Sequence, residues 1–147
     1  MEEYIAVLEQ AYADYRRDLE VFEQHRRPAD GLLGFGRTLG NDSCNERLDK
    51  RVEAAVRGLC ESQPTPEIAQ QAVKLLITWS GSGDLPMAAQ WMLRAIERHS
   101  LPLIPYLRAD AAAELLKEYS ARYKPRDLLP AQKEVYKALN ERALSGR

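Results

Sequence analysis

The spacing of the apolar residues is the feature that most limits what this chain can fold into. Along nearly the whole sequence they recur at steps of three and four residues, the period of one face of an α-helix. No segment alternates polar and apolar residues as a half-buried strand does. The residues expected on the buried face of the first helix are Ile5, Leu8, Tyr12, Tyr15, Leu19 and Phe22. We therefore predict an all-α fold.

Prolines, glycines and capping residues divide this pattern into helices. The expected helices cover about residues 2–27, 44–62, 66–79 and 86–99, then a stretch that follows Pro105 and ends near Tyr123, and a last helix that begins between Leu128 and Pro130. Most connections between them are short, which places consecutive helices antiparallel. We expect a single domain over residues 1–147, built as an antiparallel helical bundle of five to six helices. The alternative is a short α-α superhelix.

The buried face of each helix follows from the same periodicity. On the second helix it is expected to contain Leu48, Val52, Ala55, Val56 and Leu59. On the fourth it is expected to contain Ala88, Trp91, Met92, Ala95 and Ile96. Trp79 and Trp91 are interpreted as core anchors, and the alternative for both is an aromatic contact at an interface.

Composition and charge exclude several classes of protein. Hydrophobic residues make up 45% of the chain and charged residues 29%, a globular balance. The net charge of −1 argues against dedicated nucleic-acid binding, which usually needs a basic excess. No apolar stretch is long enough to cross a bilayer, and the acidic start does not resemble a secretory signal. Two cysteines are too few for a disulfide framework, so we expect free thiols and a cytoplasmic protein without a membrane partner.

Residues 28–43, PADGLLGFGRTLGNDS, depart from the helical pattern and predict a long Gly-rich loop. The segment holds four of the eight glycines of the chain together with several apolar residues. One interpretation is a compact loop that closes the end of the core, with glycines at positive φ. The other is a lip that binds a ligand or a partner. Neither a dinucleotide fingerprint nor a Walker motif is present, because the glycine spacing and the required lysine are missing.

A ligand site at this end of the bundle is a second hypothesis. Ser43 is expected to cap the second helix, whose free N–H groups and dipole would favour an anion. Alternating helices would bring the Gly-rich loop, the turn at Ser80 to Asp84 and the basic corner near Tyr123 to the same end. The candidate binding residues are Gly34, Gly36, Arg37, Asp42, Ser43, Cys44, Asp84, Lys124 and Arg126.

Candidate chemistry is sparse elsewhere. Cys44 at the first turn of a helix could have a lowered thiol pKa, but its phase with Leu48 and Val52 favours a buried structural cysteine. His25 and His99 lie near expected helix ends, where they can contact the last carbonyl groups. None of these residues shows the close pair spacing of a zinc site. We therefore predict no catalytic residue, no metal and no cofactor.

The function that the sequence favours is a non-catalytic helical module that binds another protein or a second copy of itself. Balanced charge and the lack of a reaction-centre motif support this interpretation. The alternative is a small enzyme or anion-binding protein whose site lies at the end of the bundle with the Gly-rich loop. An RNA-associated role through the basic corner ranks third.

Overall fold

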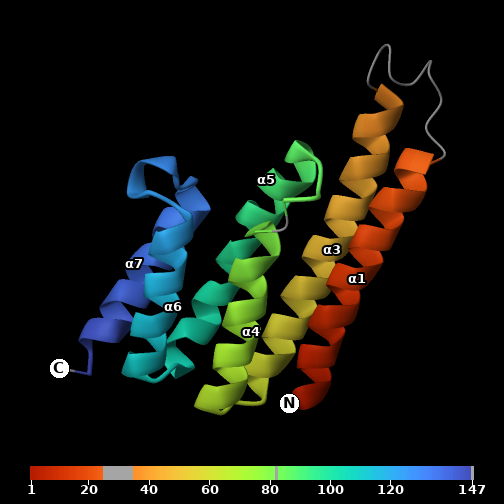
Figure 1. The fold of residues 1–147 in the computed structure, drawn as a ribbon. Helices are drawn as coiled ribbons and strands as arrows, with labels where there is room; N and C mark the ends of the chain where they lie inside the picture. The colour runs from red at the N-terminus through yellow and green to blue at the C-terminus, as the bar shows by residue number, and fades with distance from the viewer. Residues whose placement is uncertain (25–34, 82, 147) are drawn as a thin grey trace.

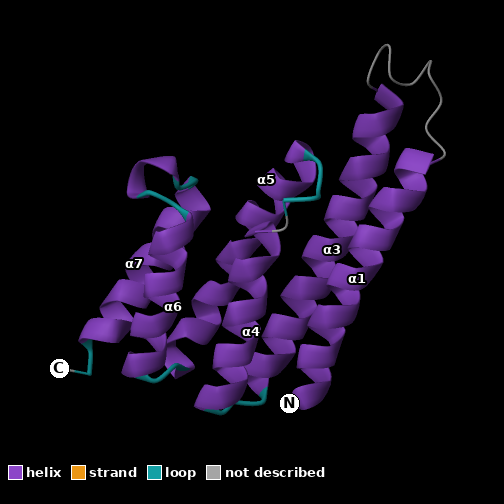
Figure 2. Cartoon of the chain, in the orientation of Figure 1, coloured by secondary structure: helices purple, strands orange, loops and turns teal. Residues whose placement is uncertain are grey.

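The structure, a computed structural model, describes the backbone of residues 1–24, 35–81 and 83–146, and the side chains of these residues except 22–24 and 35–42. Its elements are α1 (Glu2–Gln24), α3 (Phe35–Glu61), α4 (Pro66–Thr78), η1 (Trp79–Gly81), α5 (Met87–Ile96), η2 (Glu97–Tyr106), α6 (Ala109–Arg122), η3 (Pro125–Asp127) and α7 (Pro130–Leu144). Within these ranges there is no strand, as Figure 2 shows. The prediction of an all-α fold is confirmed.

The helices run alternately up and down in a row (Figure 1). α1 and α3 form a pair at one side, α4 packs against α5 and η2 in the middle, and α6 and α7 form a pair at the other side. This confirms the predicted antiparallel bundle. Both chain termini lie at the same end of the helices, and the α4–α5 and α6–α7 connections lie at the opposite end. None of the described helices is long and apolar enough to cross a membrane.

The first pair, α1 and α3, packs through the apolar faces that the sequence predicts. All five residues expected on the buried face of α3 are buried, and so are four of those expected on α1. Of the other two, Tyr12 is half-buried and the side chain of Phe22 lies outside the described part of the structure. Gly58 allows a close approach between the two helices. A Cβ atom added there would lie only 2.4 Å from Cε1 of Tyr4, so a side chain at this position would displace the tyrosine ring.

Two local signals set the ends of the central helices. Thr65 caps α4 by accepting a hydrogen bond from the backbone N–H of Ile68 at 3.2 Å, and Pro66 follows at the first helical position. The α5 helix ends where η2 begins. Pro102 and Pro105 lie inside η2, a 3₁₀ helix of ten residues, between the helices that the sequence predicts to end near residue 99 and to begin after Pro105.

The prediction that residues 28–43 form one loop is wrong for its second half. The α3 helix begins at Phe35, so Gly36 and Gly40 are helical and Ser43 is an interior residue of the helix rather than its cap. Residues 28–34 lie outside the described part of the chain. The helix can extend this far because no proline, the residue that most strongly interrupts a helix, occurs between Pro28 and Pro64. A glycine inside a helix costs only about 1 kcal/mol relative to alanine, which packing along a long helix can offset.

The buried face of α5 also differs from the prediction. Ala89, Leu93 and Ile96 are buried, whereas Ala88 and Trp91 are exposed. Gln90 and Arg94 are the only polar residues in the helix. Apolar residues therefore occur on every side of it, and periodicity alone does not define which side faces the core.

Candidate functional site

The predicted ligand site is only partly assembled. Gly34 lies outside the described residues, and the described backbone places Gly36, Arg37 and Asp42 in the first turns of α3, without their side chains. Ser43 is exposed and Cys44 is buried one residue later on the same helix. Asp84 belongs to the α4–α5 connection, and Lys124 and Arg126 belong to the exposed corner between α6 and α7.

The first turns of α3, the α4–α5 connection and the α6–α7 corner share one end of the bundle, but they do not converge. The α6–α7 corner lies on the opposite side of the row from α1 and α3, with α5 between them (Figure 1). Backbone N–H groups near Ser43 are part of the α3 hydrogen-bond ladder, because this residue lies well inside the helix. The free helix end that was to hold an anion is therefore not at Ser43.

A cleft of about 730 Å³ lies between α1 and the α4–α5 connection. Asp84 forms an ion pair across it with Arg16, which also donates a hydrogen bond to the hydroxyl of Tyr12. The charged residues that line the described part of the cleft are Arg16, Arg17, Glu20 and Asp84. Among these described residues the two cations balance the two carboxylates, so they supply no net charge with which to select an anion.

Cys44 lies against α1 and is largely shielded from water. Its side chain is buried, and burial raises the pKa of the thiol above its ordinary value, with a further contribution from the nearby carboxylate of Asp18. This environment stabilises the neutral thiol rather than the thiolate, which is the reactive form. The interpretation of Cys44 as a buried structural cysteine is consistent with these contacts.

Alkylation of the native protein measures this property directly. In a Cys60→Ser variant, which leaves Cys44 as the only thiol, iodoacetamide at neutral pH is expected to react several-fold more slowly than with an unstructured cysteine peptide. Urea should restore the peptide rate, which provides the control. A native rate equal to or above the peptide rate would show that Cys44 is a reactive thiolate after all.

A fully buried carboxylate lies at the junction of the central and C-terminal helices. Glu97, the first residue of η2, accepts hydrogen bonds from three side chains. Ser80 Oγ donates to its Oε1 at 2.8 Å, while Tyr119 OH at 2.5 Å and Gln132 Nε2 at 2.9 Å donate to its Oε2. Ser80 also lies 2.7 Å from the hydroxyl of Tyr123. These contacts join η1, η2, α6 and α7 through one side chain.

The electrostatics of Glu97 are dominated by its burial. Loss of water raises the pKa of the carboxyl, and the hydrogen bonds from Tyr119, Gln132 and Ser80 together with the charge of Arg122 act in the opposite direction. The carboxylate has no exposed surface. A solute in water therefore cannot reach the Glu97 carboxylate in this structure. Its contacts hold the helices together.

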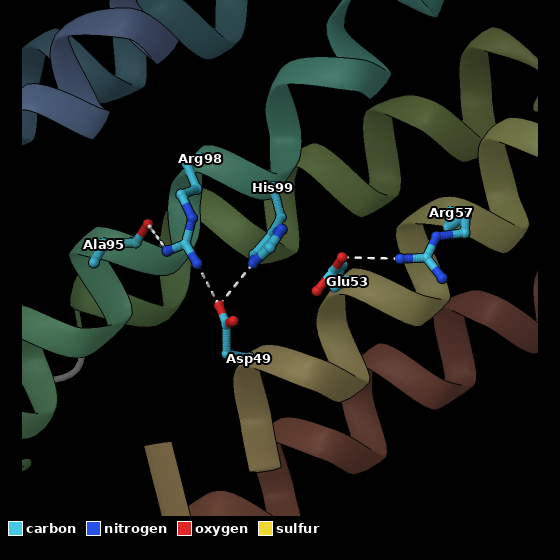
Figure 3. A network of polar contacts seen from close by, with 6 residues as sticks. All are labelled: Asp49, Glu53, Arg57, Ala95, Arg98 and His99. Atoms are coloured by element: carbon cyan, nitrogen blue, oxygen red, sulfur yellow. Dashed lines mark hydrogen bonds and ion pairs between the residues drawn. The ribbon is translucent and has the colours of Figure 1, made fainter. Parts of the chain in front are cut away.

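A second polar cluster connects α3 to η2 (Figure 3). Oδ1 of Asp49 accepts a hydrogen bond from Arg98 Nη2 at 2.7 Å and lies 2.8 Å from Nε2 of His99. The sequence suggested that His99 contacts carbonyl groups at the end of its own helix, whereas the structure pairs it with this carboxylate on another helix. His25 lies outside the described residues. The Asp49 cluster fixes the packing of two elements, which is a structural role.

The exposed face of α5 is the most unusual part of the described surface. Met87 is 69% exposed and Trp91, one turn later, is 50% exposed, whereas Trp79 is only 4% exposed and stacks on Tyr12. Ala88 lies beside them and is also exposed. Large apolar side chains that remain in water lose the favourable free energy of burial, so a contiguous group of them commonly marks a binding surface.

Arg94 extends this face towards the α6–α7 corner. Its guanidinium carbon lies 5.5 Å from the ring centroid of Trp91 and 4.9 Å from that of Tyr123. It also donates hydrogen bonds to the backbone oxygen of Asp127 at 2.5 Å and to Gln132 Oε1 at 2.9 Å. The bonds to Asp127 and Gln132 hold Arg94 in place between the two rings. We call Met87, Ala88, Trp91, Arg94 and Tyr123 the Trp91 surface.

Sequence reasoning missed Glu97 and gave an exposed Trp91 only as the alternative to a core position, although a signal for each was present. Glu97 follows Leu93 by four residues, so it occupies the buried phase of α5 continued into η2. The signal for the surface was the excess of apolar residues in α5, which is more than one buried face can accommodate.

Comparison of the chain with family models, with curated proteins and with solved structures finds no match. Among the described residues, no three of the types His, Cys, Asp and Glu lie together in a way that could hold a metal ion.

Proposed function

We propose that this chain is a non-catalytic protein interaction module that binds its partner through the Trp91 surface. The observation that carries the proposal is the exposure of Met87 and Trp91 on a helix whose opposite side is fully buried in the bundle. Tryptophan, methionine and arginine are the residue types enriched at the centres of protein interfaces. All three occur here on adjacent turns.

The polar clusters support a structural framework rather than a reaction centre. Glu97 is enclosed by its hydrogen-bond donors, and Asp49 is engaged by Arg98 and His99. The Cys44 thiol is buried with a raised pKa. These groups stabilise the bundle and so hold α5 in a fixed position, which reduces the ordering cost of binding at its outer face.

Site-specific photo-cross-linking tests the proposal. A photoreactive amino acid at Met87 is expected to capture a partner, or a second copy of the chain, in the source cell. The same group at Val7, an exposed apolar position on α1, is the matched control. Trp91→Ala in the Met87 variant should remove the adduct, because loss of an interface anchor costs about 2 kcal/mol or more, which is about 30-fold in affinity.

Trp91→Ala is not expected to disturb the fold, since surface substitutions usually change stability by no more than about 0.5 kcal/mol. Its unfolding transition in urea verifies this point. The proposal fails if Met87 and Val7 give the same adducts, or if the adduct at Met87 persists without Trp91.

A further inference from the structure

The surroundings of the Trp91 surface carry a local excess of positive charge. Arg122, Lys124 and Arg126 are exposed at the α6–α7 corner, next to Tyr123. Residues 122–127 hold one exposed carboxylate, Asp127, so the charge of this segment is 3 − 1 = +2, whereas the whole chain has a net charge of −1. Arg94 on α5 adds a fourth cation, and the carboxylate that precedes α5, Asp84, is paired with Arg16.

Contacts in the structure connect two of these cations to the apolar face, and the other two follow next to them in the chain. Arg94 lies over the rings of both Trp91 and Tyr123, and the guanidinium of Arg122 lies 5.9 Å from the centroid of Tyr123. Arg122 also donates a hydrogen bond to the backbone oxygen of Ile77, which fixes it at the end of α4. Apolar and basic groups therefore form one continuous surface rather than two separate patches.

We infer, on the basis of the proposed function, that the partner segment is an acidic amphipathic helix. Its apolar side chains would cover Met87, Ala88 and Trp91, and its carboxylates would face Lys124 and Arg126. Charge complementarity of this kind sets the choice of partner and the rate of association more than the total affinity. We choose a helix as the partner segment because the exposed side chains lie along one face of α5, and side chains on two helices can interdigitate when the helices pack together.

Nucleic acid fits the same surface less well. A phosphate backbone would be attracted by the cations, and a base could stack on Trp91. Met87 and Ala88 offer such a ligand neither a charge nor a hydrogen bond. The apolar part of the surface is accounted for only by a ligand that has apolar side chains of its own.

Fluorescence of the wild-type chain provides the assay, because the two tryptophans differ in accessibility. Trp91 is half exposed and open to quenching by acrylamide, whereas Trp79 is buried. The probe is a helix-forming peptide of about five turns with Leu on one face and Glu on the other. Two further peptides replace each Glu with Gln or with Lys, and a single-stranded poly(U) RNA serves as the nucleic-acid probe.

We expect the Glu peptide to protect Trp91 from acrylamide and to bind about tenfold more tightly than the Gln peptide. The Lys peptide should give no protection. Raising the ionic strength from about 0.1 M to 1 M shortens the Debye length from about 10 to 3 Å and should remove the difference between Glu and Gln peptides.

A matched pair of charge variants locates the effect. Lys124→Glu with Arg126→Glu should weaken binding of the Glu peptide about tenfold or more, because two attractive contacts become repulsive. Lys117→Glu with Lys137→Glu makes the same change of charge at exposed positions farther along α6 and α7, and should leave binding unchanged.

The inference is overturned if the Lys or Gln peptide binds as tightly as the Glu peptide, if both charge variants weaken binding equally, or if RNA alone protects Trp91. If no peptide protects Trp91 but cross-linking at Met87 still depends on Trp91, the acidic partner is wrong and the interaction module stands. If both assays are negative, the proposed function falls as well.

Discussion

Replacing Glu97 with alanine is expected to lower the free energy of unfolding by about 3 to 5 kcal/mol. The substitution would leave Tyr119 OH and Gln132 Nε2 without the acceptor that they share, in a region from which water is excluded. Each buried donor without a partner costs about 1 to 3 kcal/mol, and the missing side chain adds a cavity. Urea-induced unfolding followed by far-UV circular dichroism measures the loss.

Glu97→Gln is the matched control, because it keeps the volume and one acceptor oxygen. Its expected loss is smaller, about 1 to 2 kcal/mol. A loss below about 1 kcal/mol for Glu97→Ala would contradict the view that this carboxyl connects the central and C-terminal helices.

The pH dependence of the same variants follows from the raised pKa of Glu97. A carboxyl whose pKa is higher in the folded than in the unfolded chain contributes its full stability below its ordinary pKa of 4.5. That contribution is lost as the pH rises through the raised value, because the unfolded chain releases the proton first. The stability of the wild-type chain should therefore decline over this range relative to Glu97→Gln, which has no such group.

Trp79→Ala is expected to be equally damaging, with a loss of about 3 to 5 kcal/mol. Trp79 is 4% exposed, and its ring stacks on that of Tyr12 with 4.8 Å between centroids and 9° between planes. Truncation would remove the contact between η1 and α1 and leave a large cavity. The midpoint and slope of the urea transition report the change.

Trp91→Ala is the natural comparison, since it deletes the same side chain at an exposed position. Its expected effect on stability is no more than about 0.5 kcal/mol, whereas it should abolish cross-linking at Met87. Similar losses of stability for both tryptophans would mean that Trp91 is part of the core, and the binding surface proposed for it would then be wrong.

The sequence predicted those elements in which apolar and polar positions are clearly separated. On α3, Leu48, Val52 and Leu59 alternate with charged residues, so the buried face was correct in every position. On α5 nearly every position is apolar, and the predicted core face was right for Ile96 but wrong for Ala88 and Trp91. Periodicity identifies the buried face of a helix only where polar residues occupy its other faces.

The candidate site was predicted less well, because it depends on contacts between distant segments. Glu97 is buried by partners at Ser80, Tyr119 and Gln132, which no local pattern connects. The predicted ligand site assumed a helix start at Ser43, and the glycines that suggested a loop are accommodated inside α3 instead. The α4–α5 and α6–α7 connections lie at one end of the bundle, as alternating helices predict, but the row of helices keeps them apart from each other.

The placement of both chain ends opposite the α4–α5 and α6–α7 connections has a practical use. A biotin tag or a fusion protein joined to either end would attach the molecule to a sensor surface with Met87 and the basic corner directed into solution. Immobilisation through Met1 and through the C-terminal residues should then give the same binding constants. Attachment through either chain end should therefore leave the end of the bundle with the proposed binding surface accessible.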